Sequence, residues 1–385
     1  MNFAIGIVGV AVALPGALVS LHLTTLVVAS LWYRDPRPDR VPPIRFLVVI
    51  PARNEASVIG EALASIERYR RPDDIVLVVA DRCEDRTAAV ARGFGARVLE
   101  RPPDAEPGRA ASISDGVTTA ADLDWDAVVF IDADAVIERG FFEAIERTLA
   151  TGALVAQARS QSSPGRGLLA KVGEAASALG GVATQRGRDR LRAWVRLYGS
   201  GMVLRREIAE TRRFEARGAS EDGQFNLDLC LDGITARHVD AARTHFASPP
   251  DLGAASEQRL RYETGRLLSG RRYLGRLLRK RTWPAFDAAL HVGTPPLAVG
   301  VLQLVVGGAL TAFAGWWVVT WVFVGLVLIL GVDEVIALAS SEAPAATWFA
   351  LLAAPFYVLW KGWIQLRALL GVGKASRPYE PTRRV

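Results

Sequence analysis

The stretch Val128-Val-Phe-Ile-Asp-Ala-Asp134 joins a short apolar run to two carboxylates, and it indicates both a fold and a kind of site. The apolar run is typical of a buried strand. Alternate residues at a strand end point to the same side, so Asp132 and Asp134 can share one face. Such a pair suits Mg²⁺, which binds one or two carboxylates together with substrate phosphates. Taken alone, the tripeptide is more often a solvated turn.

Two similar strands lie upstream, and polar residues follow each of them. The runs Phe46 to Ile50 and Ile75 to Ala80 precede Pro51-Ala-Arg-Asn-Glu55 and Asp81-Arg-Cys-Glu-Asp85. Strands that alternate with helices predict an α/β fold, a doubly wound and mostly parallel sheet with helices on both faces. Ligands bind beyond the carboxyl ends of such strands, so the three polar segments are expected to converge. The helical patterns run from Ser57 to Arg68 and from Arg86 to Gly93.

Several acidic residues in these segments have both a structural and a functional interpretation. Asp85 fits a helix cap, with Thr87 nearby. Asp81 is better explained as an acceptor for a nucleotide base or ribose. Glu221 and Asp222 lie in the polar stretch Gly218 to Gly223, where a helix N-terminus would accommodate acidic residues. The functional alternative is a general base that takes a proton from an attacking hydroxyl.

The N-terminal segment predicts a transmembrane helix over residues 1–33. From Phe3 to Trp32 the chain is nearly free of charge and long enough to cross a bilayer. Basic residues follow this segment, at Arg34, Arg37 and Arg40, so the N-terminus is expected outside and the following domain in the cytoplasm. We expect that catalytic domain to occupy residues 44–250.

A second apolar region predicts C-terminal membrane helices over residues 295–371. From Leu297 to Val332 there is no charged residue, which fits two short spans turning near Ala314-Gly315 or one tilted span. The stretch Ala345 to Leu370 can span or lie in the interface. The basic tail, 372–385, favours a cytoplasmic C-terminus. If residues 297–332 form a hairpin of two spans, the stretch Ala345 to Leu370 would then not cross the membrane. If they form a single span, that stretch would cross it.

The charge balance favours a membrane partner over nucleic acid. The chain has 385 residues, is 50% apolar and carries a net charge of +6. Neither a zinc-binding spacing nor an aromatic-basic repeat accompanies the positive charge, so no nucleic acid is expected. From Glu257 to Arg281 nine Lys or Arg residues stand against two Glu, which predicts basic interfacial helices over 251–290. The isolated Cys83 and Cys230 fit a reducing compartment.

Five short motifs, in this order, are similar to those of the membrane-bound family 2 glycosyltransferases, which have a GT-A fold. That family includes cellulose-, hyaluronan- and poly-N-acetylglucosamine-synthase-like enzymes, and bacterial enzymes that glycosylate lipids. The resemblance covers roughly residues 44 to 270. The motifs are Pro51-Ala-Arg-Asn-Glu55, Asp81, Asp132-Ala-Asp134, Glu221-Asp222 and Gln258-x-x-Arg261-Tyr262.

The resemblance implies a role for each matched residue. Glu55 and Asp81 would hold the nucleoside, usually uridine. Asp132 would engage the ribose and the metal-diphosphate, with Mg²⁺ or Mn²⁺ bound through Asp134. Asp222 would be the base of an inverting displacement, with Glu221 beside it at the substrate. The last motif would clamp the diphosphate and cover the nucleotide through Gln258, Arg261 and Tyr262.

Two departures from the family pattern bear on function. The last motif usually ends in Trp, and Tyr262 stands here, which weakens a processive, polymer-extending interpretation. The basic residue usually found in a Gly-Lys-rich turn appears as Arg109 after Gly108, and Arg can still bind phosphate. The stretch Gly199-Ser-Gly-Met202 resembles the loop that lines the acceptor site.

These observations predict a metal-dependent hexosyltransferase that moves a sugar, expected from a UDP-sugar, to a lipid or glycan acceptor in polysaccharide or glycolipid synthesis. The expected partners are the nucleotide-sugar donor, the acceptor, the lipid bilayer and a polysaccharide export protein. The expected location is the inner cell membrane, with several spans and a cytoplasmic catalytic domain. The alternative is a non-catalytic nucleotide-sugar-binding membrane subunit of a polysaccharide synthesis or export complex. A transporter is disfavoured by the few spans.

Overall fold

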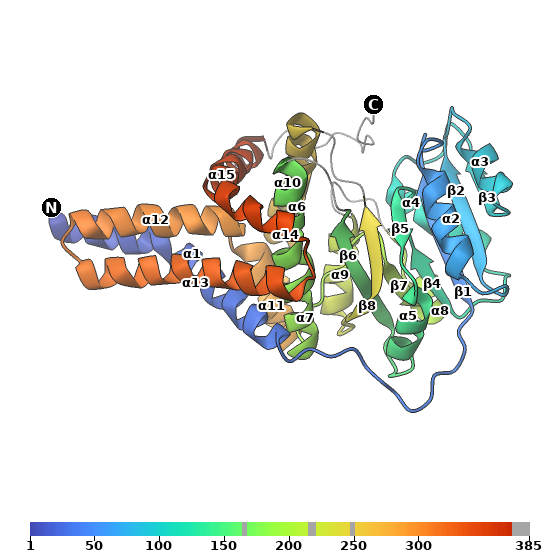
Figure 1. The fold of residues 1–385 in the computed structure, drawn as a ribbon, viewed down its shortest axis with the longest axis horizontal. Coiled ribbons are helices and arrows are strands. Elements are labelled where there is room, and N and C mark those ends of the chain that lie inside the picture. Colours follow the sequence, from blue (N-terminus) through green and yellow to red (C-terminus); the bar gives the residue numbers. More distant parts are fainter. Residues whose placement is uncertain (164–167, 215–220, 247–250, 372–385) are drawn as a thin grey trace. The chain divides into compact units, whose positions relative to one another are not determined.

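The protein consists of two compact units, each assembled from separate chain segments (Figure 1). The structure is a computed structural model, and it describes residues 1–163, 168–214, 221–246 and 251–371. The sheet unit contains the described parts of 34–163 and 194–248. The helical unit contains the described parts of 1–33, 164–193 and 249–375.

The sheet unit is built on eight strands in the order β3-β2-β1-β4-β7-β6-β8-β5. Strands β1 to β4 form a parallel half, to which β7 adds antiparallel. Strand β6 pairs antiparallel with β7 and parallel with β8, and β5 closes the edge antiparallel to β8. The strands are β1 Phe46–Ala52, β2 Ile75–Asp81, β3 Arg97–Arg101, β4 Ala127–Phe130, β5 Ala135–Ile137, β6 Val155–Ser162, β7 Met202–Arg205 and β8 Arg237–Phe246.

Helices cover both faces of this sheet, as the doubly wound prediction requires. Side chains of β1 alternate between two hydrophobic clusters, with Val48 and Ile50 in one and Leu47 and Val49 in the other. Helices α2, α3 and α5 pack on the first face, and α4, α8 and α9 on the second. These helices are α2 Ile59–Tyr69, α3 Thr87–Gly93, α4 Arg109–Thr119, α5 Phe141–Leu149, α8 Arg206–Thr211 and α9 Glu221–Leu231.

The predicted α/β fold is confirmed, and the predicted strands coincide with β1, β2 and β4. Each is an almost continuous apolar run, because a strand covered on both faces has no solvated side. The second half of the sheet, β6 to β8, is mixed in direction and was not visible in the hydrophobic pattern. Polar residues occur inside it, including Arg159, which is completely buried on β6.

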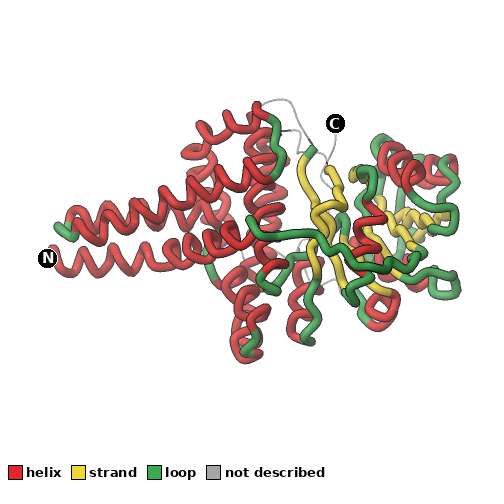
Figure 2. Tube along the Cα trace, turned by 60° about the horizontal axis from the view of Figure 1, so that its bottom comes forward, coloured by secondary structure: helices red, strands yellow, loops and turns green. Residues whose placement is uncertain are grey.

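The helical unit contains three long apolar helices that lie side by side, α1, α12 and α13 (Figure 1). Figure 2 draws the helices of this unit in red. The turn between α12 and α13 falls at residues 314–316, with Gly315 at a φ of 80°, so this region forms the hairpin alternative. The helices of the unit are α1 Asn2–Ser30, α6 Leu168–Ser177, η1 Ala178–Ala183, α7 Thr184–Arg190, α10 Leu252–Lys280, α11 Trp283–Gly293, α12 Leu297–Phe313, α13 Trp317–Ser340, α14 Ala345–Trp348, η2 Phe349–Ala353 and α15 Ala354–Gly371.

Three helical segments among the described residues are long and apolar enough to cross a membrane. They are Asn2–Ser30, Trp317–Ser340 and Ala345–Gly371. A fourth span is formed if α11 and α12, which meet at a bend of 68°, act as one. The predicted basic tail, 372–385, lies outside the described residues.

Small residues allow α1 and α12 to pack closely. A Cβ added at Gly16 would lie 2.3 Å from the carbonyl oxygen of Gly300, and one added at Gly307 would lie 2.5 Å from that of Gly9. In a bilayer the hydrophobic effect does not drive helices together, because lipid tails are as apolar as the side chains. Helices there associate through close van der Waals packing at small residues.

Gly16→Leu is therefore expected to separate α1 from α12 and to lower the thermal unfolding temperature of the purified chain. Overpacking of this kind typically costs about 1–3 kcal/mol. Gly325→Leu is the matched control, because a Cβ there meets nothing within 4 Å. Equal unfolding temperatures for the two variants would contradict the close packing of α1 and α12.

A buried ionic contact joins the three chain segments of the helical unit. Asp287 on α11 is completely buried and lies 3.0 Å from Nε2 of His22 on α1. It also accepts from Nε of Arg188 on α7 at 2.9 Å, and that guanidinium is only 3% exposed. The segment 168–193, which falls inside the range expected for the catalytic domain, thus packs with the apolar helices.

Candidate active site

The loops that follow β1 and β2 are tied together by hydrogen bonds. The backbone N–H of Glu55 donates to Oγ1 of Thr87 at 2.9 Å, and that of Ala56 donates to the carboxylate of Asp85 at 3.0 Å. Asp85 also accepts from the backbone N–H of Thr87 at 2.9 Å. The residue at the N-cap of α3 is Arg86, so Asp85 lies one residue before the cap position expected for it. Burial alone would raise the pKa of Asp85, but these hydrogen bonds lower it below its ordinary value. The two loops are thereby held as one polar rim.

Asp81 is held at the end of β2 by two arginines. Its carboxylate accepts from Nη1 of Arg101 and from Nε of Arg82 at 3.1 Å. The register of the sheet places Arg101 of β3 directly beside Asp81. Asp81 is only 5% exposed, so a base or ribose bound there would share the carboxylate with these guanidinium groups. Its nucleoside role remains a prediction.

Arg109 brings two of the predicted acidic residues together. Its Nη1 donates to Oδ1 of Asp222 at 2.7 Å, and its Nη2 donates to Oδ1 of Asp132 at 3.0 Å. Nη2 also donates to the carbonyl oxygen of Gly199 at 2.6 Å. Gly108 precedes α4 with a φ of 121°, a conformation that favours glycine, and this turn lets Arg109 open the helix. Residues from α4, the end of β4, the stretch before β7 and the start of α9 therefore meet at one point.

The surroundings of Asp222 raise the pKa of its carboxyl group. Burial raises its pKa to about 7, Arg109 opposes that rise, and the nearby carboxylates Glu221 and Asp132 add to it. A carboxyl group that titrates near neutrality can accept a proton near pH 7. Glu221 and Asp222 begin α9, as expected, while Gly218 to Ser220 lie outside the described residues.

The acidic residues at the end of β4 offer hard oxygen donors of the kind a divalent cation prefers. The side chain of Asp132 is 36% exposed, and Asp134 follows in the turn before β5. Within the described residues, His, Cys, Asp and Glu form no group of three or more that could hold a metal ion. Such a set fits Mg²⁺ or Mn²⁺ only together with oxygen atoms of a substrate, as is usual for a metal that bridges protein and diphosphate.

The last predicted motif lies on helix α10 of the other unit. Arg261 and Tyr262 each lie about one helical turn after Gln258 on α10, so each neighbours Gln258 on the helix surface. The Tyr262 side chain is 54% exposed. The clamp over the nucleotide that these residues are expected to form remains a prediction.

Comparison with protein families identifies the group to which the fold and these motifs belong. The model named glycosyltransferase-like family 2 matches residues 42–265, more than half of the chain. The chain belongs to glycosyltransferase-like family 2. This confirms the resemblance read from the five motifs.

Two known proteins illustrate the similarity of this family 2 chain to others. It is 38% identical over 95 residues to the 4,4'-diaponeurosporenoate glycosyltransferase of Staphylococcus aureus, an alignment that spans 24% of each protein. Among solved structures, the mannosyltransferase PcManGT of Pyrobaculum calidifontis, in complex with GDP-Man and Mn²⁺, superposes with a TM-score of 0.62 at 16% identity. The superposition covers 98% of this chain and 100% of that one. The likeness shows a shared GT-A-type fold.

Two residues that contact the predicted site residues were not predicted from the sequence. Arg101 ends a strand whose sequence alternates between polar and apolar residues, so it looks exposed. In the structure its strand pairs with β2, and Arg101 is 6% exposed and bound to Asp81. The Ser200 hydroxyl lies 3.3 Å from the backbone nitrogen of Asp132, which donates to it. Ser200 could have been found, because it lies within the Gly199 to Met202 stretch already assigned to the acceptor side.

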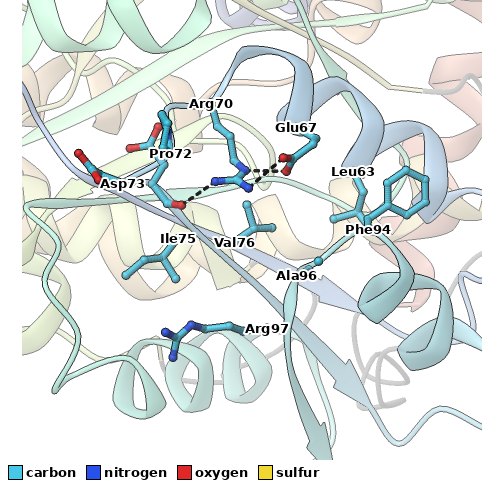
Figure 3. A pocket seen from close by; sticks show the side chains of 12 residues that line it. Leu63, Glu67, Arg70, Pro72, Asp73, Ile75, Val76, Phe94, Ala96 and Arg97 are labelled. Carbon is cyan, nitrogen blue, oxygen red and sulfur yellow. Dashed lines mark hydrogen bonds and ion pairs between the residues drawn. The ribbon is translucent and has the colours of Figure 1, made fainter.

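A separate hollow of about 220 Å³ lies at the opposite end of β2 (Figure 3). On its rim, Arg70 donates to both carboxylate oxygens of Glu67, at 2.6 and 2.9 Å, and to the carbonyl oxygen of Asp74 at 3.1 Å. The charge of Arg70 is thus satisfied within the chain. None of the predicted site residues lines this hollow, so it is distinct from the candidate active site.

Proposed function

We propose that the chain is an inverting glycosyltransferase that moves a sugar from a nucleoside diphosphate to an acceptor at a membrane. The observation that carries this proposal is the contact of Arg109 with both Asp132 and Asp222. It supports a site in which a positively charged side chain, a diphosphate-binding carboxylate and a base of pKa about 7 act on one substrate. Family membership supports nucleotide-sugar chemistry.

In the proposed mechanism Asp222 accepts the proton of the acceptor hydroxyl. The hydroxyl oxygen then forms a bond to the anomeric carbon, and the bond from that carbon to the diphosphate oxygen breaks. Attack opposite to the leaving group inverts the anomeric centre. Arg109 opposes the rise in the pKa of Asp222 that burial causes, and its guanidinium can meet the diphosphate when the donor is bound. Glu55 and Asp81 are proposed to hold the nucleoside.

Asp134, with Asp132, would hold a divalent cation on the donor diphosphate. When bound, such a metal neutralises negative charge on the leaving group. The Mn²⁺ in the Pyrobaculum calidifontis mannosyltransferase supports a divalent cation for this fold.

The donor and the acceptor are proposed at the level of class. The Pyrobaculum calidifontis protein binds GDP-Man, and the Staphylococcus aureus relative is named for 4,4'-diaponeurosporenoate. Together with Tyr262 in place of Trp, this supports single addition to a lipid rather than growth of a polymer. The basic residues after α1 support a cytoplasmic catalytic domain at the inner membrane.

The test is a panel of nucleotide sugars incubated with purified chain and native membrane lipids. We expect consumption of one donor, loss of that consumption in EDTA, and recovery with Mn²⁺ or Mg²⁺. One sugar per lipid on a gel would support single addition. Donor binding without turnover across the panel and the lipids would favour the alternative of a non-catalytic nucleotide-sugar-binding subunit.

Asp134→Ala is expected to weaken metal-dependent donor binding by at least about tenfold, the low end of the loss when even an outer-shell contact to a metal is removed. Binding of the labelled nucleotide would be measured by titration with and without EDTA. Asp104→Ala is the matched control, since Asp104 is exposed in a loop of the same unit. Unchanged metal-dependent binding in Asp134→Ala would remove Asp134 from the metal site.

The pH dependence of kcat/KM follows from the raised pKa of Asp222. Only the ionised carboxylate can accept a proton, so activity is expected to rise with pH through about 7 and to level off above. A profile of initial rates between pH 5 and 9 would be measured at subsaturating acceptor. A profile already flat from pH 5 upward would contradict the base role or the raised pKa.

A further inference from the structure

Helix α15 of the helical unit has its polar side inward and its apolar side outward. Tyr357, Lys361 and Gln365 are spaced by one helical turn and lie on a single stripe about 12 Å long. Lys361 and Gln365 are only 7% and 6% exposed. The opposite face is exposed and apolar, and consists of Phe356, Leu359, Trp363, Leu366 and Leu370.

The polar stripe of α15 packs against one face of α10. Lys361 donates to Glu263 at 2.8 Å, and Trp360 donates to the hydroxyl of Ser256 at 3.1 Å. Glu263 also accepts from Arg266 at 3.1 Å. This face of α10 carries residues 256, 259, 263 and 266, and differs from the face that carries Gln258, Arg261 and Tyr262. The two faces of α10 can therefore serve two different ligands.

Arg259 leaves this cluster with an unbalanced positive charge. Its side chain is partly buried, and the described residues provide it with neither a hydrogen bond nor an ion pair. It lies within electrostatic range of Lys361 and of the Tyr357 hydroxyl. Glu334 of α13 also lies within range of Tyr357. Even with Glu334 ionised, three cations face two carboxylates, so an anion would be attracted.

Oxygen atoms beside the same stripe lack donors. Buried side-chain oxygens of Gln303, Glu334 and Gln365 have no hydrogen-bond partner within the described part of the chain. Leu302 lies against Gly362, which brings that turn of α12 to α15. A buried acceptor without a donor is unfavourable, so hydroxyl groups from outside the chain would stabilise it.

We propose that the stripe Tyr357–Lys361–Gln365 of α15, together with Arg259 of α10, binds the headgroup of a phospholipid that carries hydroxyl groups. The phosphate would pair with Arg259 and Lys361, and headgroup hydroxyls would donate to Gln365 and Glu334. The acyl chains would extend from this site into the lipid that the exposed apolar residues of α15 indicate around the helix. The site is formed wholly within the helical unit, so it does not depend on the proposed transferase activity.

The test measures lipid retention by the full chain in bilayer discs of phosphatidylcholine with added phosphatidylglycerol. Native mass spectrometry would count the phosphatidylglycerol molecules retained. We expect Arg259→Gln to weaken retention at least about tenfold, the loss typical of a charge-assisted hydrogen bond. Arg271→Gln is the matched control, because Arg271 is exposed on the same helix and the charge change is identical. Equal losses in the two variants would overturn the site in favour of general attraction to a basic helix.

A second comparison tests the hydroxyl contacts. Phosphatidylmethanol has the same phosphodiester charge and no headgroup hydroxyl, so the wild type is expected to prefer phosphatidylglycerol and Gln365→Leu to lose that preference. Equal retention of both lipids by the wild type would overturn the hydroxyl assignment. Free glycerol 3-phosphate at millimolar concentration is expected not to displace the lipid. Displacement by it, or no retained phosphatidylglycerol at all, would overturn a lipid as the occupant and favour a soluble anion or ordered water.

Discussion

Asp222→Asn is expected to lower the rate of sugar transfer by a factor on the order of 10²–10⁴, the typical contribution of a positioned base. Asparagine keeps the shape of the side chain and an oxygen for Arg109, but it cannot accept the proton of the acceptor hydroxyl. Binding of the nucleotide donor is expected to persist, because it rests on other residues. The measurement is transfer from a labelled donor, alongside a binding titration.

The control for this variant is its stability. The folded-state pKa of Asp222 is raised from 3.8 to about 7, so proton binding stabilises the fold fully below about pH 4 and this stabilisation is lost as the pH rises through 7. At pH 8 the wild type buries an ionised carboxylate that asparagine removes. Asp222→Asn should then unfold at the same or a higher temperature than the wild type.

A second control makes the same change at a surface position. Asp232→Asn lies just past the same helix, in an exposed pair with Arg212 that is expected to contribute little. It should transfer at the wild-type rate. An Asp222→Asn enzyme that does the same would remove Asp222 from the mechanism.

Asp287→Ala is expected to destabilise the helical unit by about 3–5 kcal/mol, the cost of removing one partner from a buried ion pair. Arg188 would be left buried without its carboxylate, and His22 would lose the oxygen 3.0 Å from its ring. Thermal unfolding of the purified chain would report the loss. The effect should be larger than that of most substitutions, because desolvation of Arg188 is no longer compensated.

Glu257→Gln is the matched control for this loss of a carboxylate. Glu257 is exposed on α10 of the same unit, so its change should leave the unfolding temperature within a degree or so. A mild effect of Asp287→Ala, comparable with that of Glu257→Gln, would mean that the ionic contact does not hold the three segments together.

The fold could be predicted from the sequence where a strand is buried on both sides, because such a strand is a continuous apolar run. Strands β1 and β2 begin where the pattern placed them, and β1 extends two residues beyond Ile50. The helix predicted from Ser57 begins at Ile59, because Val58 and its neighbours are in the turn tied to the β2 loop. Such boundaries depend on side-chain contacts with other loops, which hydrophobic periodicity does not report.

The candidate site could be predicted in part, from residues that belong to recognisable motifs. Arg109, Asp132 and Asp222 were selected by motif order, and the structure brings their side chains together. The partner of Asp81 was not readable, since Arg101 is distant in sequence and meets Asp81 only through strand register.

The burial of residues in the segment 168–193 could not be predicted from the sequence either. Its arginines are typical of an exposed segment, yet Arg188 is buried and paired with a carboxylate. A Cβ added at Gly187 would lie 2.0 Å from the carbonyl oxygen of Leu26. Composition reports neither kind of contact, because both depend on residues far along the chain.

The contact at Asp287 sets an order for the synthesis of the protein. His22 leaves the ribosome early, Arg188 follows after the first six strands of the sheet, and Asp287 emerges about a hundred residues later. Until then, both His22 and Arg188 lack the carboxylate of Asp287 that joins them. The sheet can thus begin to form on the growing chain, whereas the bundle around the first helix waits for the last third of translation.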